Sequence, residues 1–338
     1  MTSRERVFEA LNHRQTDPIP YTVSFTPGAY EHMQHYTGDK AFDKDWVSHM
    51  HSVMYDGWPT PIPDRQGFMK DEFGVVLNRT MDEREWGVVE SYQVDFENNQ
   101  YVFPPLDEAR WRGDIERMLA SKGDRFAFAS LGCSLYERSW TLAGMENVLA
   151  AMVMYPSEYH ELLDRICERN MRVIEIALEY DIDGFYFGDD WGSQRGMIMG
   201  PDHWRTFIKP RDKRMYGLVK KHGKIVLHHS CGNIEAIMRD FIEIGCDCYE
   251  TVQPDVYDLA KLKTEYGADI TFWGCISEQQ LLPYGTPQQV RDVTINTLRL
   301  MGKNGGFIAA PTHAITRDVP PENVLAMADV FVNQDKYL

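Results

Sequence analysis

Short apolar runs alternate with amphipathic stretches along most of the chain after residue 125. Glycine or aspartate flanks these runs, which cover residues 126–130, 184–188, 225–229, 246–250, 270–274 and 307–310. Apolar runs of this length, without polar alternation, are typical of parallel strands that helices cover on both faces. We therefore predict a parallel strand at each run.

The stretches between the runs carry helix signals. Residues 157–180 keep an apolar period of about 3.6 residues, and proline at position 201 suits the first turn of a helix. Thr286 and Pro287 predict an N-cap and first helical residue, and Pro320-Pro321 opens the last helix. Repeated strand–helix alternation indicates one α/β layer system, closed or doubly wound.

The first 125 residues are less regular. We predict a helix over 3–13, a strand over 19–25, a hairpin from 71–77 and 87–92, and a helix over 106–119. These elements suit a first barrel strand followed by insertions that cover one end. The predicted fold is an α/β (β/α)₈ TIM barrel with N-terminal helical and hairpin additions, forming a single domain over residues 1–338.

Composition narrows the classes of partner. The formal net charge of −16 argues against nucleic acid, which needs a surplus of Lys and Arg on one face. No apolar run is long enough to span a membrane, and the N-terminus lacks the apolar core of a signal peptide, so we expect a cytoplasmic protein. Its six cysteines are too few for a disulfide scaffold and suit reduced thiols.

Groups that bind metals or carry protons stand at the ends of most predicted strands. They are Ser130 and Gly132, Asp189 and Asp190, His229 and Cys231, Glu250, Cys275, and His313. In parallel barrels the active site forms at the carboxyl ends of the strands, because the following loops converge there. We therefore expect these residues to gather around one active site.

His229-Ser230-Cys231 is the strongest local signal. In extended backbone, residues two positions apart point to the same side, so the imidazole and the thiolate can converge on one ion. Zn²⁺ accepts such mixed ligands, and a catalytic site keeps three protein ligands and an open position. His313 is the predicted third ligand, although a general acid or a substrate hydrogen-bond donor is an alternative role.

The other strand-end residues are less specific. Adjacent residues point to opposite faces, so only one of Asp189 and Asp190 can enter the site, while the other can cap the following segment. Both are candidate catalytic residues. Glu250 is a further candidate metal ligand, and the third and fourth ligands stay open among His313, Glu250, Gln253 and Cys275.

Aromatic residues provide candidates for substrate binding. Tyr186, Trp191, Phe25 and Trp273 are expected to contact the substrate, and packing in the core is the alternative, which is the commoner use of large aromatic residues. The segment Asp71-Glu72-Phe73-Gly74 suits either a polar hairpin edge or a substrate loop.

The chain resembles the uroporphyrinogen decarboxylase superfamily and, within it, the corrinoid-dependent methyltransferases. The resemblance covers residues 3 to 334, and the stretches that carry it are 135–140, 144–147, 188–192, 229–233, 285–287 and 311–313. It implies the barrel fold. Decarboxylases of the family grip substrate carboxylates with an arginine-rich N-terminal loop, whereas this chain has Tyr-Thr-Val-Ser-Phe-Thr-Pro at 21–27, without arginine.

The resemblance also implies a function. Methyltransferases of this branch bind zinc through a pair like His229 and Cys231 and a further cysteine, a place that His313 holds here. The implied reaction moves a methyl group from a small methyl donor, such as a methoxylated aromatic or another O-, N- or S-methyl compound, to the cobalt of a separate corrinoid (cobalamin) protein. Asp190 would orient the donor or protonate the leaving group.

Three other functions compete with methyl transfer. They are decarboxylation of the uroporphyrinogen type, zinc-dependent hydrolysis, and non-catalytic binding of a small molecule. A homodimer is also compatible with the sequence.

Overall fold

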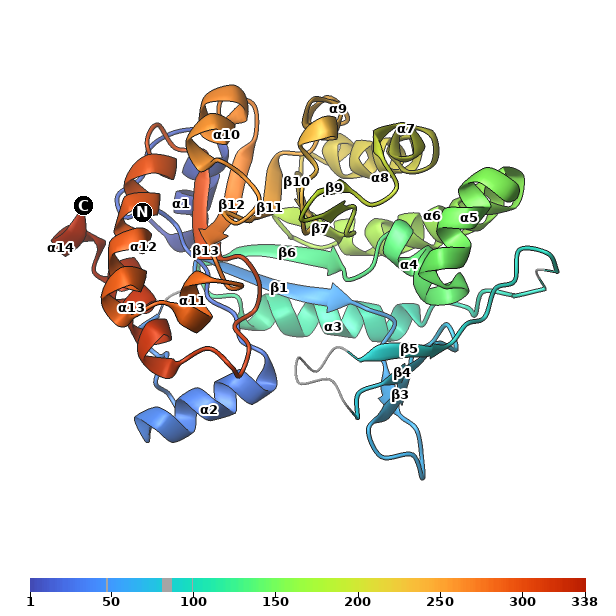
Figure 1. The fold of residues 1–338 in the computed structure, drawn as a ribbon, viewed down its shortest axis with the longest axis horizontal. Helices are drawn as coiled ribbons and strands as arrows, with labels where there is room; N and C mark the ends of the chain where they lie inside the picture. Colours follow the sequence, from blue (N-terminus) through green and yellow to red (C-terminus); the bar gives the residue numbers. More distant parts are fainter. Residues whose placement is uncertain (47, 81–86, 99) are drawn as a thin grey trace. The chain divides into compact units, whose positions relative to one another are not determined.

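The computed structural model describes residues 1–338 except 47, 81–86 and 99 (Figure 1). Contacts between residues divide the chain into two compact units. The terminal unit contains Met1–His51, Lys122–Ala127 and Asp247–Leu338, and the central unit contains Ser52–Ser121 and Phe128–Cys246. Each unit combines strands with helices, as the alternating pattern predicts.

The main strands of the central unit lie in the order β1-β6-β7-β10. They are β1 (Met50–Tyr55) and β6 (Phe126–Leu131), which both begin in the terminal unit, with β7 (Gly184–Gly188) and β10 (Ile225–His229). β7 pairs in parallel with both neighbours, aligning Tyr186 with Ser130 and Gly188 with His229. The predictions for β7 and β10 are confirmed residue by residue.

Helices cover one face of these strands. They are α3 (Glu108–Ser121), α4 (Tyr136–Ala143), α5 (Met145–Met154), α6 (Pro156–Leu178), α7 (Pro201–His203), the π-helix Trp204–Ile208, α8 (Lys209–Lys221), the 3₁₀ turn Glu235–Ile237 and α9 (Met238–Glu243). The ring of Tyr55 meets Trp111 of α3, and Phe187 and His228 meet Tyr216 of α8. Because side chains alternate along a strand, Tyr186 and His229 point to the opposite face.

The predicted hairpin forms part of an antiparallel sheet in the central unit. The sheet contains β2 (Thr60–Pro61), β3 (Phe68–Lys70), β4 (Val76–Asn78) and β5 (Val88–Ser91) in sequence order. The predicted strand over 71–77 is shorter than expected, because a turn precedes β4 and only its last residues pair with β5. A second small sheet pairs β8 (Gly192–Ser193) with β9 (Gly196–Met197).

The terminal unit pairs β11 (Cys248–Val252), β12 (Thr271–Ile276) and β13 (Phe307–Pro311) in parallel. Its helices are α1 (Ser3–Leu11), α2 (Pro27–Thr37), α10 (Leu259–Tyr266), α11 (Leu281–Tyr284), α12 (Pro287–Met301), α13 (Pro321–Val332) and α14 (Gln334–Tyr337). Thr286 caps α12 through a reciprocal bond with Gln289, confirming the predicted helix start.

Two strand predictions are wrong in detail. The expected strand over 19–25 is reduced to isolated bridges, from Tyr21 to Ala309 and from Phe25 to Ile315, and Pro20 inside this segment has no backbone N–H to donate. The strand expected at 246–250 lies at 248–252, so Glu250 stands mid-strand rather than at a strand end. The α/β architecture is confirmed, whereas barrel closure by eight strands and the single domain over 1–338 stay predictions.

Candidate metal centre

A cluster of three potential metal ligands, Asp190, His229 and Cys231, lies in the central unit, where β7 and β10 end side by side. Asp190 follows β7, and His229 and Cys231 stand at the end of β10. The chain turns directly after Cys231 at Gly232, whose φ is +73°. A side chain at Gly232 would clash with the backbone of Gly192, so glycine is required for the two loops to approach. This close approach brings the ends of both strands together.

Three potential ligand atoms converge there. The Nε2 atom of His229 lies 3.2 Å from Oδ1 of Asp190 and 3.4 Å from Sγ of Cys231. All three ligand atoms lie within 4.8 Å of one another. The backbone N–H of Cys231 donates to Oδ1 of Asp190 at 2.7 Å, which fixes this carboxylate beside the thiol. The side chains of His229 and Asp190 are 14% and 35% exposed, so an ion can reach them.

The donor set suits zinc. Imidazole nitrogen, thiolate and carboxylate oxygen are the three ligand types that Zn²⁺ accepts in proteins. The convergence of His229 and Cys231 matches the sequence prediction. Asp190 was predicted as a catalytic residue, and its position beside both of these side chains makes it a ligand candidate as well. Sequence reasoning alone did not reveal this, because nothing in the chain shows which of two adjacent aspartates faces the histidine.

Asp189 has a different environment from its neighbour. Its side chain is completely buried and accepts hydrogen bonds from the N–H groups of Tyr136 and Glu137 at 3.0 and 2.7 Å. The indole N–H of Trp191 also donates to it, at 2.8 Å. Since Leu135 provides no side-chain cap, Asp189 caps the N-terminus of α4 from another part of the chain. As expected, one aspartate faces the site and the other is a cap, but Asp189 caps α4, which lies earlier in the chain, and not the segment that follows the two aspartates.

Glu137 is a site neighbour that sequence reasoning missed. Burial, together with the nearby carboxylates of Asp190 and Asp189, raises the pKa of Glu137 well above its ordinary value, and His229 acts in the opposite direction. Its position one residue into α4 made it look like an ordinary helix residue. The signal that could have found it is its place just after the end of β6, at the same edge as Asp190.

Tyr186 lies on the same strand face as the cluster. Its ring centroid is 6.4 Å from that of His229 and 5.7 Å from that of Phe128. Trp191, in contrast, is completely buried and packs on His228 with ring centroids 4.3 Å apart. The structure therefore favours the core alternative for Trp191, whereas Tyr186 keeps a position suited to substrate contact.

The remaining predicted site residues belong to the terminal unit. Phe25 packs against Tyr30, Phe42 and Trp46, and the indole N–H of Trp273 donates to Thr22 at 2.9 Å. The other candidates of this unit are His313, which is half-buried two positions after β13, and the buried residues Glu250, Gln253 and Cys275. The roles of all these residues stay predictions.

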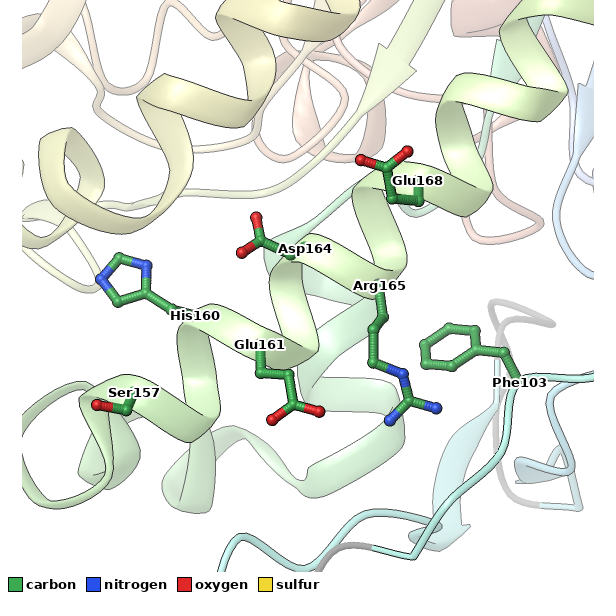
Figure 2. A pocket seen from close by; sticks show the side chains of 7 residues that line it. All are labelled: Phe103, Ser157, His160, Glu161, Asp164, Arg165 and Glu168. Carbon is green, nitrogen blue, oxygen red and sulfur yellow. The ribbon is translucent and has the colours of Figure 1, made fainter.

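A groove of about 520 Å³ lies elsewhere in the central unit, along α6. Figure 2 shows His160, Glu161 and Asp164 projecting from this helix, and Arg165 facing Phe103 of a neighbouring segment. The guanidinium of Arg165 lies 4.8 Å from the Phe103 ring centroid. None of the three clustered ligand residues lines this groove, so it is separate from the candidate metal centre.

Comparison with known proteins identifies the family. The sequence pattern described as uroporphyrinogen decarboxylase (URO-D) matches residues 129–333. The chain belongs to the URO-D family. The matched region contains the whole cluster and the strands that position it.

Proteins similar to this chain carry different names. A uroporphyrinogen decarboxylase from Psychromonas ingrahamii is 24% identical over 52% of this chain and 48% of its own length. A methylated-thiol–coenzyme M methyltransferase from Methanosarcina mazei is 22% identical over 55% of this chain and 47% of its own length. The matches thus span about half the length of these curated relatives.

A solved structure shows the fold along the full chain. The structure of a methyltransferase from Methanosarcina mazei is 19% identical, covers 100% of both chains and gives a TM-score of 0.72. This likeness shows a shared fold and leaves the reaction to be argued from the site. Among the described residues, no helix is long and apolar enough to cross a membrane.

Proposed function

We propose that this chain is a zinc-dependent methyltransferase that transfers a methyl group from a small methyl donor to the cobalt of a separate corrinoid protein. The observation that carries the proposal is the convergence of His229, Cys231 and Asp190 at the ends of two adjacent parallel strands. The names of two similar proteins, a methylated-thiol–coenzyme M methyltransferase and a methyltransferase of known structure, support the same reaction class.

His229, Cys231 and Asp190 would hold the zinc ion, and His313 stays the additional ligand that the sequence predicts. A bound zinc ion would supply Lewis acidity at an open coordination position, where it stabilises charge on a departing heteroatom. As a ligand, Asp190 would anchor the zinc ion. This role replaces the protonation of the leaving group that the family resemblance implies. Tyr186 would contact the body of the donor.

The proposed methyl transfer is a nucleophilic displacement. The electron pair of Co(I) forms the bond from cobalt to the methyl carbon, and the bond from that carbon to oxygen, nitrogen or sulfur breaks. The leaving heteroatom keeps the bonding electron pair and takes a proton from solvent. We propose a methoxylated aromatic or a similar O-, N- or S-methyl compound as the donor.

Decarboxylation is the main alternative, because two similar proteins are named uroporphyrinogen decarboxylases. A substrate with many carboxylates needs cationic groups for recognition. On the central-unit strands, the face that carries His229 presents Phe128, Ser130, Tyr186 and Leu227, none of which is cationic. The charged groups described beside His229 are the carboxylates of Asp190 and Glu137, which would repel a polycarboxylate, so these surroundings favour a small methyl donor without carboxylates.

The proposal is tested by measuring zinc content and methyl transfer in the same preparations. Purified protein is mixed with Co(I) cobalamin and a series of methoxyarenes, methylamines and methylthiols while the cobalt spectrum is followed. We expect His229→Ala and Cys231→Ala to lose bound zinc and transfer together. His222→Ala, which changes an exposed histidine at the end of α8, is the matched control and should retain both.

Full zinc stoichiometry in both cluster variants would contradict the proposal. So would release of CO₂ from a porphyrinogen by wild-type protein that transfers no methyl group. His313→Ala adds a separate test, in which an unchanged zinc affinity would remove His313 from the proposed ligand set.

A further inference from the structure

Two ion pairs lie at the turn between β3 and β4, one of them buried and the other partly exposed. Oδ2 of Asp71 accepts from Arg138 at 2.8 Å, and the two side chains are only 5% and 7% exposed. The adjacent Glu72 pairs with Arg169 of α6 at 2.6 Å. The sequence left residues 71–74 open between a polar hairpin edge and a substrate loop. The structure shows instead that their charges point into the central unit and meet arginines.

The turn is ordered by its own contacts as well. Oδ1 of Asp71 accepts from the backbone N–H of Val75 at 2.9 Å, so one carboxylate holds both the turn and Arg138. Phe73 contacts both arginines, with guanidinium carbons 4.1 Å (Arg138) and 5.3 Å (Arg169) from its ring centroid. Such cation–π contacts strengthen when the groups are desolvated, as they are here.

A chain of hydrogen bonds links this turn to the candidate metal centre. Arg138 belongs to α4, and the N–H groups of Tyr136 and Glu137 in the first turn of α4 donate to Asp189. Asp189 is covalently joined to Asp190, whose carboxylate lies against His229 and the Cys231 backbone. Any tilt of α4 therefore shifts the backbone that carries Asp190.

We propose that Asp71 and Arg138 form a positioning pair that holds α4 in the orientation needed to place Asp190 against His229 and Cys231. Neither residue is a metal ligand or a catalytic residue. Buried pairs cost desolvation, and hydrophobic replacements often match them in stability. The geometry of α4, rather than stability alone, gives this pair a function. The inference rests on the proposed metal centre, but its first test needs no metal.

The first test follows amide hydrogen exchange in metal-free protein. Asp71→Asn keeps the size of the side chain and removes its charge. We expect exchange at least tenfold faster in peptides that cover 135–139, 189–191 and 229–233. Glu90→Gln is the matched control, because Glu90 of β5 pairs with Arg65 of the loop between β2 and β3, but both side chains are more than 40% exposed. This control should exchange like the wild type.

The second test measures metal binding. Outer-shell partners of ligands typically change metal affinity by about 10- to 100-fold, and we expect a loss in this range for zinc in Asp71→Asn. In cobalt(II)-substituted protein, the thiolate-to-cobalt absorption band should weaken or shift, because it reports the distance from Cys231 to the ion. Glu90→Gln should leave both the affinity and the band unchanged.

The conservative variant Arg138→Lys covers the case in which Asp71→Asn does not fold. Lysine keeps the charge opposite Asp71 but cannot also reach the Asp56 carbonyl, which Arg138 contacts at 3.2 Å. We expect a smaller change of the same kind, and the double variant Asp71→Asn/Arg138→Gln should add little to the stronger single variant.

The outcomes separate this inference from the proposed function. A lower unfolding temperature in Asp71→Asn, with exchange in the three peptides, zinc affinity and cobalt spectrum all unchanged, would make the pair purely structural and overturn the inference. If the wild-type protein binds zinc yet transfers no methyl group, the proposed function fails. The positioning role would still stand on the exchange and affinity data.

Discussion

The ends of β10 and β12 each present a cysteine, in contrasting surroundings. Cys231 is half-buried, and its sulfur lies 3.4 Å from the imidazole of His229. Cys275 of β12 is 1% exposed, and burial raises the pKa of its thiol above the ordinary value, an effect that Lys263 only partly opposes. Both residues satisfy the same sequence rule, a soft ligand at the end of a parallel strand, but only Cys231 combines accessibility with a neighbouring ligand.

The two aspartates after β7 repeat this contrast over one peptide bond. Asp190 is accessible and faces His229, whereas Asp189 is enclosed and accepts three hydrogen bonds. A buried carboxylate saturated by donors anchors its surroundings and has little capacity left for an ion. The residue type at a strand end therefore defines the candidate metal ligands. The exposure of each side chain and its neighbours then decide which candidates can bind an ion.

The largest expected effect separates the two cysteines. Cys231→Ser should weaken zinc binding by at least on the order of 100-fold, since it removes a proposed ligand rather than an outer-shell partner. Cys275→Ser should leave zinc affinity within about twofold but lower the free energy of unfolding by about 1–3 kcal/mol, because it buries an unpaired hydroxyl. Competition with a chromophoric chelator and urea unfolding measure the two quantities.

The cysteine comparison fails if Cys275→Ser loses zinc as strongly as Cys231→Ser while keeping wild-type stability. That result would make Cys275 a ligand, which is one of the alternatives that the sequence left open. Cys167→Ser, at a buried position on α6, provides a control for the general cost of placing serine in the core.

A smaller effect should separate the two aspartates. Asp190→Asn should lower zinc affinity by about 10- to 100-fold, with little change in the stability of the metal-free protein. Asp189→Asn replaces one acceptor oxygen by an NH₂ group that faces backbone donors, so we expect a loss of about 1–3 kcal/mol in the free energy of unfolding. Denaturant unfolding in chelator, with zinc titration in parallel, distinguishes them. Equal effects of both variants on zinc affinity would contradict the division of roles.

Sequence periodicity predicted the strands that carry the metal centre, because β7 and β10 are continuous apolar runs bounded by glycine or aspartate. It failed at 19–25, where only isolated bridges form, and it placed β11 two residues early, so that Glu250 seemed to end a strand. The polar residues Glu250 and Thr251 lie inside β11, so the apolar pattern does not mark where this strand ends.

The cluster was predictable only in part. His229 and Cys231 share one strand, so their spacing alone implies a common direction. The contact of Asp190 with His229 depends on the pairing of two strands, and Asp71 meets Arg138 across 67 residues of sequence. No local pattern reports such pairs. Glu137 had one sequence signal, its place after the end of β6, but only the fold shows that the start of α4 meets the end of β7.

The smallest expected effect concerns Asp212 of α8, a helix that packs against the face of β10 opposite His229. Its carboxyl group is completely buried, and neither oxygen has a hydrogen-bond partner among the described residues. Burial, followed by the charge of Asp189, raises the pKa of Asp212 well above its ordinary value. One turn later on the same helix, the hydroxyl of Tyr216 contacts Nδ1 of His228 at 2.6 Å, so this carboxyl group lies among residues that pack against the back of β10.

A raised pKa in the folded state fixes the sign of the pH dependence. The contribution of Asp212 to stability is fully present below its unfolded pKa and is lost as the pH rises through its folded pKa. Asp212→Asn removes this dependence, so it should match the wild type near pH 3.5 and become more stable by about 1–3 kcal/mol at pH 8. Unfolding in chelator at several pH values measures the difference.

Asp240 of α9 serves as the control with the opposite sign. Hydrogen bonds from Arg205, and also from Lys209, lower the pKa of Asp240, so its contribution is present above its unfolded pKa and is lost as the pH falls. Asp240→Asn should therefore be less stable than the wild type at pH 8, and the difference should narrow in acid. Parallel pH profiles for Asp212→Asn and the wild type would mean that Asp212 is ionised and solvated in the folded protein. The packed, water-excluding back of β10 inferred from the structure would then be wrong, whereas the accessible cluster on its other face would be untouched.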